Sequence, residues 1–410
     1  EVVVVLGDSA MIQELKNYLW HWPKAVIAGL AYGFPSGKLT LIGVTGTKGK
    51  TTTSHLIYFL LKESGYKVGL ISTIGAYLDD KEIDTGLHVT SPDPIGLNKL
   101  LKLAVDSGIK YVVLEVTSNG LDQFRVWGLR FAVSVITNIN PDHLDYHKTM
   151  ERYVDAKGKI IKQSKAIVLN RNIPYFSKLT KIAKDAGTKL SALRLSDFPR
   201  KANIQAAVAT IKMLGLKVKN QDKILMNFPG VPGRMETVFD KKFKIIIDFA
   251  HTPESLRAAL REIRLNVKNN GRLIAVFGCA GERDHGRRKM GEVAAKQADF
   301  FVITAEDPRT EKVEEISEEI AGWAEKAGAS EVYETEFVDK KFRKPPIFIR
   351  IPDRQEAINF AVKMAKTGDV IGLFGKGHEK SMCFGKTEMP WSEHEAVKKA
   401  LKICAESSDT

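Results

Sequence analysis

Short apolar, often β-branched runs alternate with longer segments of helical periodicity along nearly the whole chain. The runs that predict strands lie at 39–44, 67–73, 111–117, 133–139 and 166–170, and then at 244–249, 272–278, 299–304, 346–351 and 369–374. The amphipathic segments that predict helices include 51–63, 94–107, 201–214, 253–264, 287–297, 313–327, 354–366 and 393–404. This alternation is typical of α/β folds, in which parallel sheets carry helices on both faces.

A segment rich in Pro and Gly, 227–234, separates the two series of strands and has the composition of a linker. A chain of 410 residues is too long for one ordinary core. We therefore predict a short N-terminal segment at 1–37, a central domain at 38–230 and a C-terminal domain at 231–410. Residues 1–10 precede the first methionine, Met11, so they are candidates for a leader added to the natural protein.

The composition indicates a globular protein of the cytoplasm, with 44% hydrophobic and 27% charged residues. No apolar run approaches the roughly 20 residues that span a bilayer. The three cysteines lack metal-site spacing, which favours a reducing compartment. The net charge of +13 suits a polyanionic ligand such as ATP, although a solvated basic surface explains it as well. No nucleic-acid-binding signature accompanies it, so we expect no nucleic acid and no membrane partner.

A glycine-rich turn between a predicted strand and a predicted helix carries the strongest chemical signal. Directly after 39–44 the chain reads Gly46-Thr47-Lys48-Gly49-Lys50-Thr51-Thr52. The two glycines permit a tight turn whose N–H groups, with the helix N-terminus, surround phosphate oxygens. Lys50 is expected to reach the β- and γ-phosphates, and the Thr51 hydroxyl to bind Mg²⁺. The usual pattern has glycine at position 44, where this chain has Val44 after Gly43.

Acidic and histidine side chains follow two further predicted strands. Glu115 lies near the end of 111–117, and Asp142 and His143 follow 133–139. The carboxyl ends of parallel strands meet in the ligand crevice of such sheets, so a Mg²⁺ site is expected there, although His is an unusual ligand for that ion. An ordinary surface loop with two histidines is the alternative, which the upstream phosphate loop makes less favourable.

These segments resemble the Mur ligases, ATP-dependent enzymes that add amino acids to the peptidoglycan precursor and are related to the folylpolyglutamate synthetases. The family usually has Asn where this chain has Lys48. The resemblance implies that the whole turn binds ATP, that Asn138 lies near the γ-phosphate, and that Glu115 and His143 hold a second Mg²⁺. Tyr153-Val-Asp-Ala-Lys157 is similar to the family's Tyr-x-x-Ala-Lys, whose lysine is often carbamylated. A plain exposed helix lysine is the alternative for Lys157.

The resemblance continues through the second half of the chain. It implies a P-loop-type, parallel-sheet central ATPase domain followed by a Rossmann-like α/β C-terminal domain. Val231-Pro-Gly-Arg234 and Asp248-Phe-Ala-His251 are similar to family motifs, the second with Phe in place of Tyr. Asn203 is expected near the adenine, Arg234 and Asp248 near the nucleotide, and His251 in catalysis.

Other motifs are similar to the branch of the family that forms the tripeptide. This similarity implies that Thr90 and Ser91 contact the muramoyl peptide. It also implies that the incoming amino acid is contacted by Asp307, Arg309, Gly375 and Glu379. Glu306-Asp307-Pro-Arg309 replaces the branch's Asp-Asn-Pro-Arg, so lysine and diaminopimelate both remain open as the added amino acid. Asn119 stands where the branch has His. A simple helix-capping turn is the alternative for 90–93.

The sequence thus predicts a ligase that activates a carboxylate as an acyl phosphate and couples it to an amino acid, using ATP and two Mg²⁺ ions. The favoured substrates are UDP-N-acetylmuramoyl-dipeptide with diaminopimelate or lysine. About 30 residues precede the phosphate loop's strand, where the branch normally carries a UDP-binding domain. Three alternatives remain. The acceptor could differ (cyanophycin-type, folylpolyglutamate-type or another peptide), a partner chain could supply that domain, or the chain could be a non-catalytic nucleotide-binding regulator.

Overall fold

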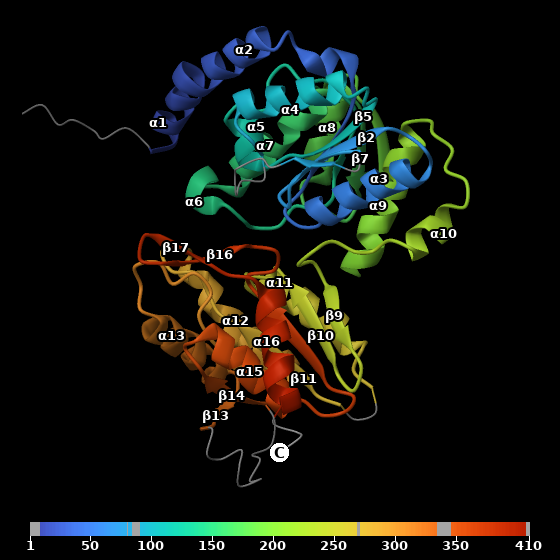
Figure 1. Cartoon of the computed structure of the whole chain (residues 1–410). Helices are drawn as coiled ribbons and strands as arrows, with labels where there is room; N and C mark the ends of the chain where they lie inside the picture. The colour runs from blue at the N-terminus through green and yellow to red at the C-terminus, as the bar shows by residue number, and fades with distance from the viewer. Residues whose placement is uncertain (1–8, 80, 84–90, 269–270, 334–345, 407–410) are drawn as a thin grey trace, which may run out of the picture. The chain divides into compact units, whose positions relative to one another are not determined.

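The computed structural model describes residues 9–79, 81–83, 91–268, 271–333 and 346–406 (Figure 1). The chain forms two compact units, Glu1–Pro229 and Gly230–Thr410, and each is described by itself. Each unit contains one large, mostly parallel β-sheet covered by helices, so the predicted α/β class is confirmed.

Unit 1 is built on an eight-stranded sheet with the order β4-β3-β2-β5-β1-β6-β7-β8. Its strands are β1 Thr40–Thr45, β2 Val68–Ile71, β3 Ala76–Leu78, β4 Lys81–Ile83, β5 Tyr111–Glu115, β6 Phe131–Ile136, β7 Ser164–Asn170 and β8 Lys189–Leu193. All pairings are parallel except those of the edge strands β3 and β4. Because β1 lies between β5 and β6, the chain changes direction across the sheet there, and the carboxyl ends of these strands are where such sheets bind ligands.

Helices cover both faces of this sheet. The helical elements of unit 1 are α1 Ser9–Lys16, η1 Asn17–His21, α2 Trp22–Ala31, η2 Pro35–Lys38, α3 Lys50–Glu63, α4 Pro94–Asp106, α5 Ser118–Asp122, α6 Leu144–His147, α7 Met150–Lys162, α8 Phe176–Asp185, α9 Pro199–Met213 and α10 Gln221–Met226. Neighbouring residues of β1 enter opposite cores: Leu41 packs in one with Leu101 of α4, and Ile42 in the other with Leu60 of α3. Burial on both faces explains why these strands are continuous apolar runs.

Unit 2 has a seven-stranded sheet with the order β13-β14-β12-β11-β15-β10-β9 and a separate hairpin. Its strands are β9 Glu236–Asp240, β10 Lys244–Asp248, β11 Leu273–Phe277, β12 Phe300–Ile303, β13 Ser330–Glu331, β14 Ile347–Arg350 and β15 Val370–Phe374, with the hairpin β16 Ser381–Phe384 and β17 Thr387–Pro390. Only the edge strand β9 is antiparallel within the sheet. The helices are α11 Pro253–Arg264, η3 His285–Lys289, α12 Met290–Gln297, α13 Val313–Lys326, α15 Arg354–Met364 and α16 Glu393–Glu406.

All ten predicted strands are present, with ends shifted by up to three residues, as in β6, which spans Phe131–Ile136 rather than 133–139. The prediction did not include the short strands at the sheet edges or several helices, among them α1, α2 and α8. Edge strands are only half covered and lack the continuous apolar runs of the centre. In the part of the chain that the structure describes, no helix is both long enough and apolar enough to cross a bilayer.

Candidate active site

The glycine-rich turn of unit 1 is a tight loop between β1 and α3. Gly46 and Gly49 have φ angles of 148° and 78°, which favour glycine. A Cβ atom on Gly46 would lie 2.0 Å from Thr137 Oγ1, and one on Gly49 would lie 2.3 Å from Asn203 Oδ1. Both glycines are therefore required by backbone conformation and by the close approach of neighbouring side chains.

The loop is held by the residues that follow β6. Asn138 Oδ1 accepts a hydrogen bond from the Lys48 N–H at 2.8 Å, and Asn138 Nδ2 donates to the Lys48 carbonyl at 2.9 Å. The Thr137 hydroxyl donates to the same carbonyl at 2.6 Å. The Thr47 N–H donates to the carbonyl of Asn138 at 3.0 Å. The structure therefore gives Asn138, which was predicted to lie near a phosphate, a definite part in shaping the phosphate loop.

The first residues of α3 present the two side chains predicted to act on phosphate and metal. Lys50 Nζ donates to the carbonyls of Gly46 and Thr47 at 3.2 and 3.0 Å. Thr51 Oγ1 donates to Glu115 Oε1 at 3.1 Å, and Glu115 Oε2 accepts from the Thr73 N–H at 3.1 Å. Glu115 is only 1% exposed. The structure therefore brings a buried carboxylate and a hydroxyl together at the first turn of α3.

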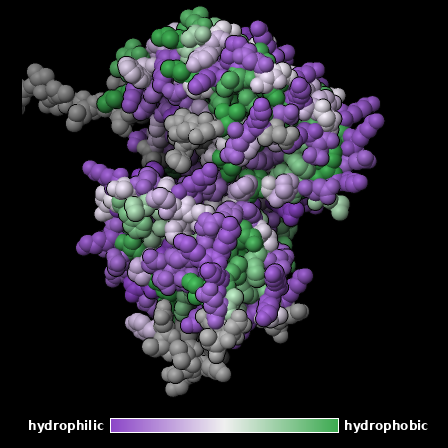
Figure 2. Space-filling model, in the orientation of Figure 1, coloured by the Kyte–Doolittle hydropathy of each residue, from purple (hydrophilic) through white to green (hydrophobic). Residues whose placement is uncertain are grey.

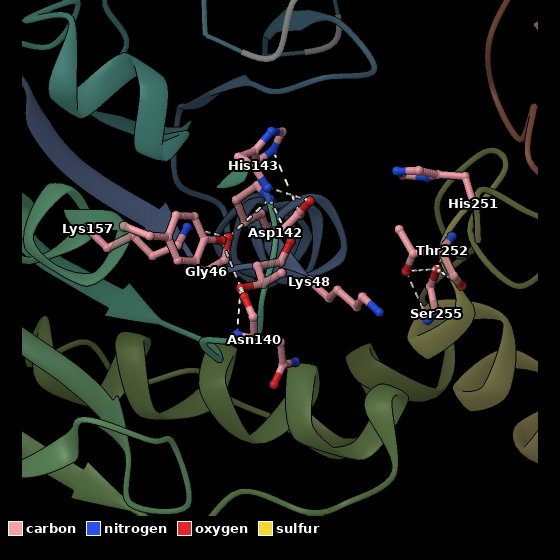
Figure 3. Close-up of polar contacts among 12 residues, drawn as sticks. Gly46, Lys48, Asn140, Asp142, His143, Lys157, His251, Thr252 and Ser255 are labelled. Atoms are coloured by element: carbon pink, nitrogen blue, oxygen red, sulfur yellow. Dashed lines mark hydrogen bonds and ion pairs between the residues drawn. The ribbon is translucent and has the colours of Figure 1, made fainter. Parts of the chain in front are cut away.

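Lys157 of α7 lies beneath the loop and is only 1% exposed, which excludes an ordinary surface lysine. Its Nζ donates to the Gly46 carbonyl at 2.8 Å and lies 4.6 Å from the centre of the Tyr153 ring (Figure 3). Burial, with a smaller contribution from the positive charge of Lys50, holds the pKa of Lys157 well below its ordinary value, and Asp142 opposes this effect. The amine is consequently a candidate for the neutral form.

His143, the third predicted metal ligand, lies just before α6 in a left-handed conformation with φ 52°. Its side chain is 49% exposed, and its backbone N–H donates to Asp142 Oδ1 at 3.0 Å (Figure 3). Among the described residues, no group of three or more His, Cys, Asp or Glu side chains is assembled as a metal site. Thr51 and Glu115 are thus brought into contact, whereas the side chain of His143 is half exposed.

Two other predicted positions in unit 1 have structural partners. Asn203 of α9 is 8% exposed and accepts a hydrogen bond from the Thr53 hydroxyl at 3.3 Å, so it lies against the loop. Ser91 is 2% exposed; its Oγ lies 3.2 Å from Thr117 Oγ1 and accepts from the Thr117 N–H. Thr90 lies outside the described residues.

In unit 2, Arg234 and His251 lie beside the aromatic ring of Phe249, the residue that follows Asp248. The Arg234 guanidinium lies 4.3 Å from the centre of the Phe249 ring, and the His251 ring lies 4.6 Å from it. Asp248 accepts backbone hydrogen bonds from Met235 and Ala250 at 2.8 and 2.9 Å. His251 Nδ1 is 2.8 Å from the Phe249 carbonyl; because a carbonyl can only accept, Nδ1 carries the proton and Nε2 is the basic nitrogen.

The second site of unit 2 is an acidic cluster around Lys376. This lysine lies between Gly375 and Glu379 in the sequence, but it was not among the predicted site residues. Lys376 is 1% exposed and lies 2.8 Å from Asp307 Oδ1 and 2.7 Å from Glu379 Oε2. Burial opposes its charge, but the two carboxylates outweigh burial and raise the pKa of Lys376. The predicted residues Asp307 and Glu379 are therefore brought together by a cation.

Glu306 adds a third acid to this cluster. It is 5% exposed, and burial raises its pKa to about 7, with Lys376 opposing the shift and Asp307 and Glu379 adding to it. Its Oε2 has no hydrogen-bond partner among the described residues. A Cβ atom on Gly375, whose φ is 106°, would lie 3.1 Å from the Glu306 side chain. Gly375 thus permits the acid to approach the backbone.

Arg309 lies beside this cluster in a left-handed conformation with φ 54°. Its backbone is fixed to the hairpin, because its N–H donates to the Cys383 carbonyl at 3.0 Å and its carbonyl accepts from Gly385 at 2.7 Å. Its Nε is buried and has no hydrogen-bond partner among the described residues. The side chain therefore retains a donor for a ligand.

A glycine-rich loop after β1 of a mostly parallel sheet, with a buried hydroxyl–carboxylate pair beside it, is the arrangement of α/β phosphate-binding domains. Residues 44–231 match the Mur ligase middle domain, and residues 233–377 match the Mur ligase glutamate ligase domain. The chain belongs to the Mur ligase family.

Individual relatives agree with this assignment. The UDP-N-acetylmuramoyl-L-alanyl-D-glutamate–2,6-diaminopimelate ligase 1 of Clostridium acetobutylicum is 35% identical over 92% of this chain and 81% of its own length. A solved structure of a ligase of the same name has a TM-score of 0.59 and 27% identity, covering 89% of this chain and 78% of its own. Escherichia coli FolC in complex with DHPP and ADP has the same fold, with a TM-score of 0.69 at 18% identity over 98% of this chain and 99% of its own. As a Mur ligase, the chain is an ATP-dependent ligase that forms an amide bond.

Proposed function

We propose that this ligase joins diaminopimelate or lysine to the free carboxylate of UDP-N-acetylmuramoyl-L-alanyl-D-glutamate. The observation that carries the proposal is the preformed loop Gly46–Thr52, with the buried pair Thr51–Glu115 at its end. The name of the Clostridium acetobutylicum relative supports the choice of substrates. In the two-step reaction, the carboxylate displaces ADP from the γ-phosphoryl group, and the amine then displaces phosphate from the acyl phosphate.

Unit 1 supplies the phosphate site of this proposal. The backbone N–H groups of the loop and the N-terminus of α3 stabilise negative charge on the β- and γ-phosphates. When ATP binds, Lys50 Nζ donates to phosphate oxygens in place of the carbonyls of Gly46 and Thr47. Positioning and electrostatic stabilisation of the transferring group provide most of the rate, since little covalent chemistry is left to the protein.

The hydroxyl and carboxylate of Thr51 and Glu115 are hard oxygen donors, which fit Mg²⁺. When bound, that ion neutralises charge on the phosphate groups. We assign His143 to a second ion only as the family resemblance implies, because its side chain is half exposed.

Lys157 is proposed to be carbamylated. A neutral amine attacks CO₂, a N–C bond forms and one proton is released, which leaves an anionic carbamate. The lowered pKa of Lys157 supplies the neutral amine, and its position against the Gly46 carbonyl places the new charge beside the phosphate loop.

Unit 2 is proposed to bind the amino acid and to present His251. Arg309 retains a buried Nε donor for a carboxylate, and a guanidinium binds carboxylates well. The two carboxylates of Asp307 and Glu379 exceed the single charge of Lys376, so the cluster favours a substrate with an extra ammonium group. Diaminopimelate offers both a carboxylate and an ammonium group at its distal end, whereas lysine offers only an ammonium group there. His251 Nε2 is proposed to accept the proton of the attacking amine.

One assay tests the proposal: phosphate release by the purified chain across a matrix of acceptors and amino acids, with the product masses measured. We expect release only when ATP, the muramoyl dipeptide and diaminopimelate or lysine are all present. Lys50→Ala is expected to abolish release, while Lys99→Ala, an exposed lysine of α4, serves as the matched control. A product formed on a folate or another peptide would replace the acceptor that we propose, and ATP binding without release under any condition would contradict catalysis.

A further inference from the structure

The turn at residues 231–236, near the start of unit 2, has a strained backbone. Gly233 and Met235 have φ angles of 66° and 49°, in the left-handed region that a residue with a side chain seldom adopts. A Cβ atom on Gly233 would lie 2.2 Å from the backbone nitrogen of His378, so the turn also packs closely against its neighbours. Such a conformation persists only where the surrounding structure holds it in place.

Two carboxylates hold this turn. Asp248 Oδ2 accepts a hydrogen bond from the Met235 N–H at 2.8 Å, and Glu236 Oε2 accepts one from the Gly233 N–H at 2.7 Å. Glu236 is itself held by His394 in the first turn of α16, whose Nε2 lies 3.0 Å from both carboxylate oxygens. Because an ionised carboxylate can only accept, Nε2 carries a proton and the imidazole fixes the carboxylate against the turn.

The turn supports the side chains that we assign to the reaction. The Arg234 guanidinium lies 4.3 Å from the centre of the Phe249 ring, and the His251 ring lies 4.6 Å from it. A Cβ atom on Gly377 would lie 2.9 Å from Phe249 Cβ and 3.0 Å from the Gly233 carbonyl oxygen, so no free space separates these segments. A displacement of the turn would therefore be transmitted to Phe249 and to His251.

The charge of His394 depends mainly on Glu236. The hydrogen bond to Glu236, with the charges of Glu236 and Glu393, raises the pKa of His394, while burial and Lys398 oppose the shift. Glu393 accepts a hydrogen bond from Arg354 Nε of α15 at 2.9 Å, which offsets its charge. The imidazole is 36% exposed, and Figure 2 shows hydrophilic side chains over the part of unit 2 where Figure 1 draws α16, so solvent can protonate it.

We propose that His394 is a positioning residue of this ligase, which acts through Glu236 on the turn that carries Arg234. In its protonated form His394 donates a charge-assisted hydrogen bond, which is roughly twice as strong as a neutral one. Loss of the proton leaves a weaker bond, so the turn and the Phe249 ring are held less firmly beside His251. The inference rests on the proposed function, because it requires His251 to accept the proton of the attacking amine.

The test compares phosphate release by the wild type and by His394→Arg, between about pH 6 and about pH 9. A guanidinium stays charged over this range, and dividing the two kcat profiles cancels the groups that both proteins share. We expect the ratio of wild type to variant to fall by about fivefold as pH rises through the raised pKa of His394, because a hydrogen bond from a charged donor is the stronger one. The KM for the muramoyl dipeptide should not change, because we assign that contact to unit 1.

Three further variants define the pair. His394→Ala and Glu236→Gln should each lower kcat, and their ratio to one another should stay constant with pH, because both lack the ion pair. Lys402→Ala, at a lysine of α16 that is 79% exposed, is the matched control and should follow the wild type at every pH. If His394→Arg does not fold by circular dichroism, His394→Lys supplies the permanent charge.

Hydrogen exchange of the backbone N–H groups of 231–236 needs no catalysis and separates this proposal from the proposed function. Exchange should be faster in His394→Ala than in the wild type and in His394→Arg at the same pH. A constant kcat ratio of wild type to His394→Arg, a wild-type kcat in His394→Ala, or equal exchange in all three proteins would each overturn the proposal. No phosphate release by the wild type, with the exchange difference present, would overturn the ligase reaction but support the action of His394 on the turn.

Discussion

Lys157 and Lys376 are equally buried, each 1% exposed, yet their surroundings drive their ionisation in opposite directions. Lys157 meets a backbone carbonyl and an aromatic ring, and its pKa is lowered. Lys376 meets two carboxylates, and its pKa is raised. Burial penalises an ammonium group in both places. The paired carboxylates outweigh this penalty at Lys376, whereas Asp142 does not outweigh it at Lys157.

The difference suggests a division of labour between the two units. A neutral, buried amine is chemically reactive, which fits a lysine that is to be modified beside the phosphate loop. A paired, buried ammonium is inert and holds together acids that would otherwise repel one another. Replacing each lysine in turn tests whether the two side chains differ in ionisation and in function.

The largest effect is expected at Lys157. Lys157→Ala should reduce phosphate release by at least about 100-fold, because it removes charge that acts directly on the transferring group. With ¹³C-labelled bicarbonate, nuclear magnetic resonance should show a carbamate signal in the wild type and in Lys376→Ala, but none in Lys157→Ala. Full activity of Lys157→Ala, or a carbamate signal that persists in it, would remove the proposed role.

The next effect concerns the stability of unit 2. Lys376→Met leaves Asp307 and Glu379 beside the buried Glu306 without a counter-charge, so it should lower the free energy of unfolding by about 3–5 kcal/mol. Chemical denaturation of the variant against the wild type measures this loss. A loss below about 1 kcal/mol would show that the cluster is solvated and that Lys376 does not hold it together.

The pH dependence of stability tests the state of Glu306, whose pKa is about 7 against an ordinary value of 4.5. Between these values the folded protein retains a proton that the unfolded chain releases, so stability falls as pH rises and then levels off above pH 7. Each unit of pKa difference corresponds to about 1.4 kcal/mol, so the wild type should lose about 3 kcal/mol relative to Glu306→Gln over this window. Parallel curves for the two proteins would contradict the raised pKa.

The smallest effect is expected for the stability of Lys157→Met. In protein prepared without added CO₂, replacing the buried amine by an apolar side chain of similar length removes one hydrogen bond, which is worth about 1 kcal/mol. The change in the free energy of unfolding should thus be much smaller than for Lys376→Met, in the same denaturation experiment. Equal losses for the two variants would mean that Lys157 is charged and paired in solution.

Much of the fold could be predicted because the central strands are buried on both faces. Runs such as the one that becomes β1 are apolar without interruption, which is a strong local signal. The missed elements are the ones that tertiary contacts stabilise: α5 has five residues, and the edge strand β4 has three. Segments of this length contain less than two periods of any pattern.

The site could be predicted as a set of segments, but not as a set of contacts. The glycine spacing and the strand ends located the loop and Glu115, and a family motif pointed to Lys157. Lys376 was not predicted as a site residue, because the family resemblance assigned substrate contacts only to its neighbours Gly375 and Glu379. The signal that could have found it is chemical: several acids predicted at neighbouring strand ends require a cation among them.

The sequence by itself determined the α/β class, the phosphate loop and membership of the Mur ligase family, because local periodicity and spaced motifs carry that information. The tertiary structure decided which side chains are charged and which surface is exposed. It buried Lys157 against a backbone carbonyl and Lys376 between two carboxylates. Burial and pairing arise from residues far apart in the chain, so no local pattern records them.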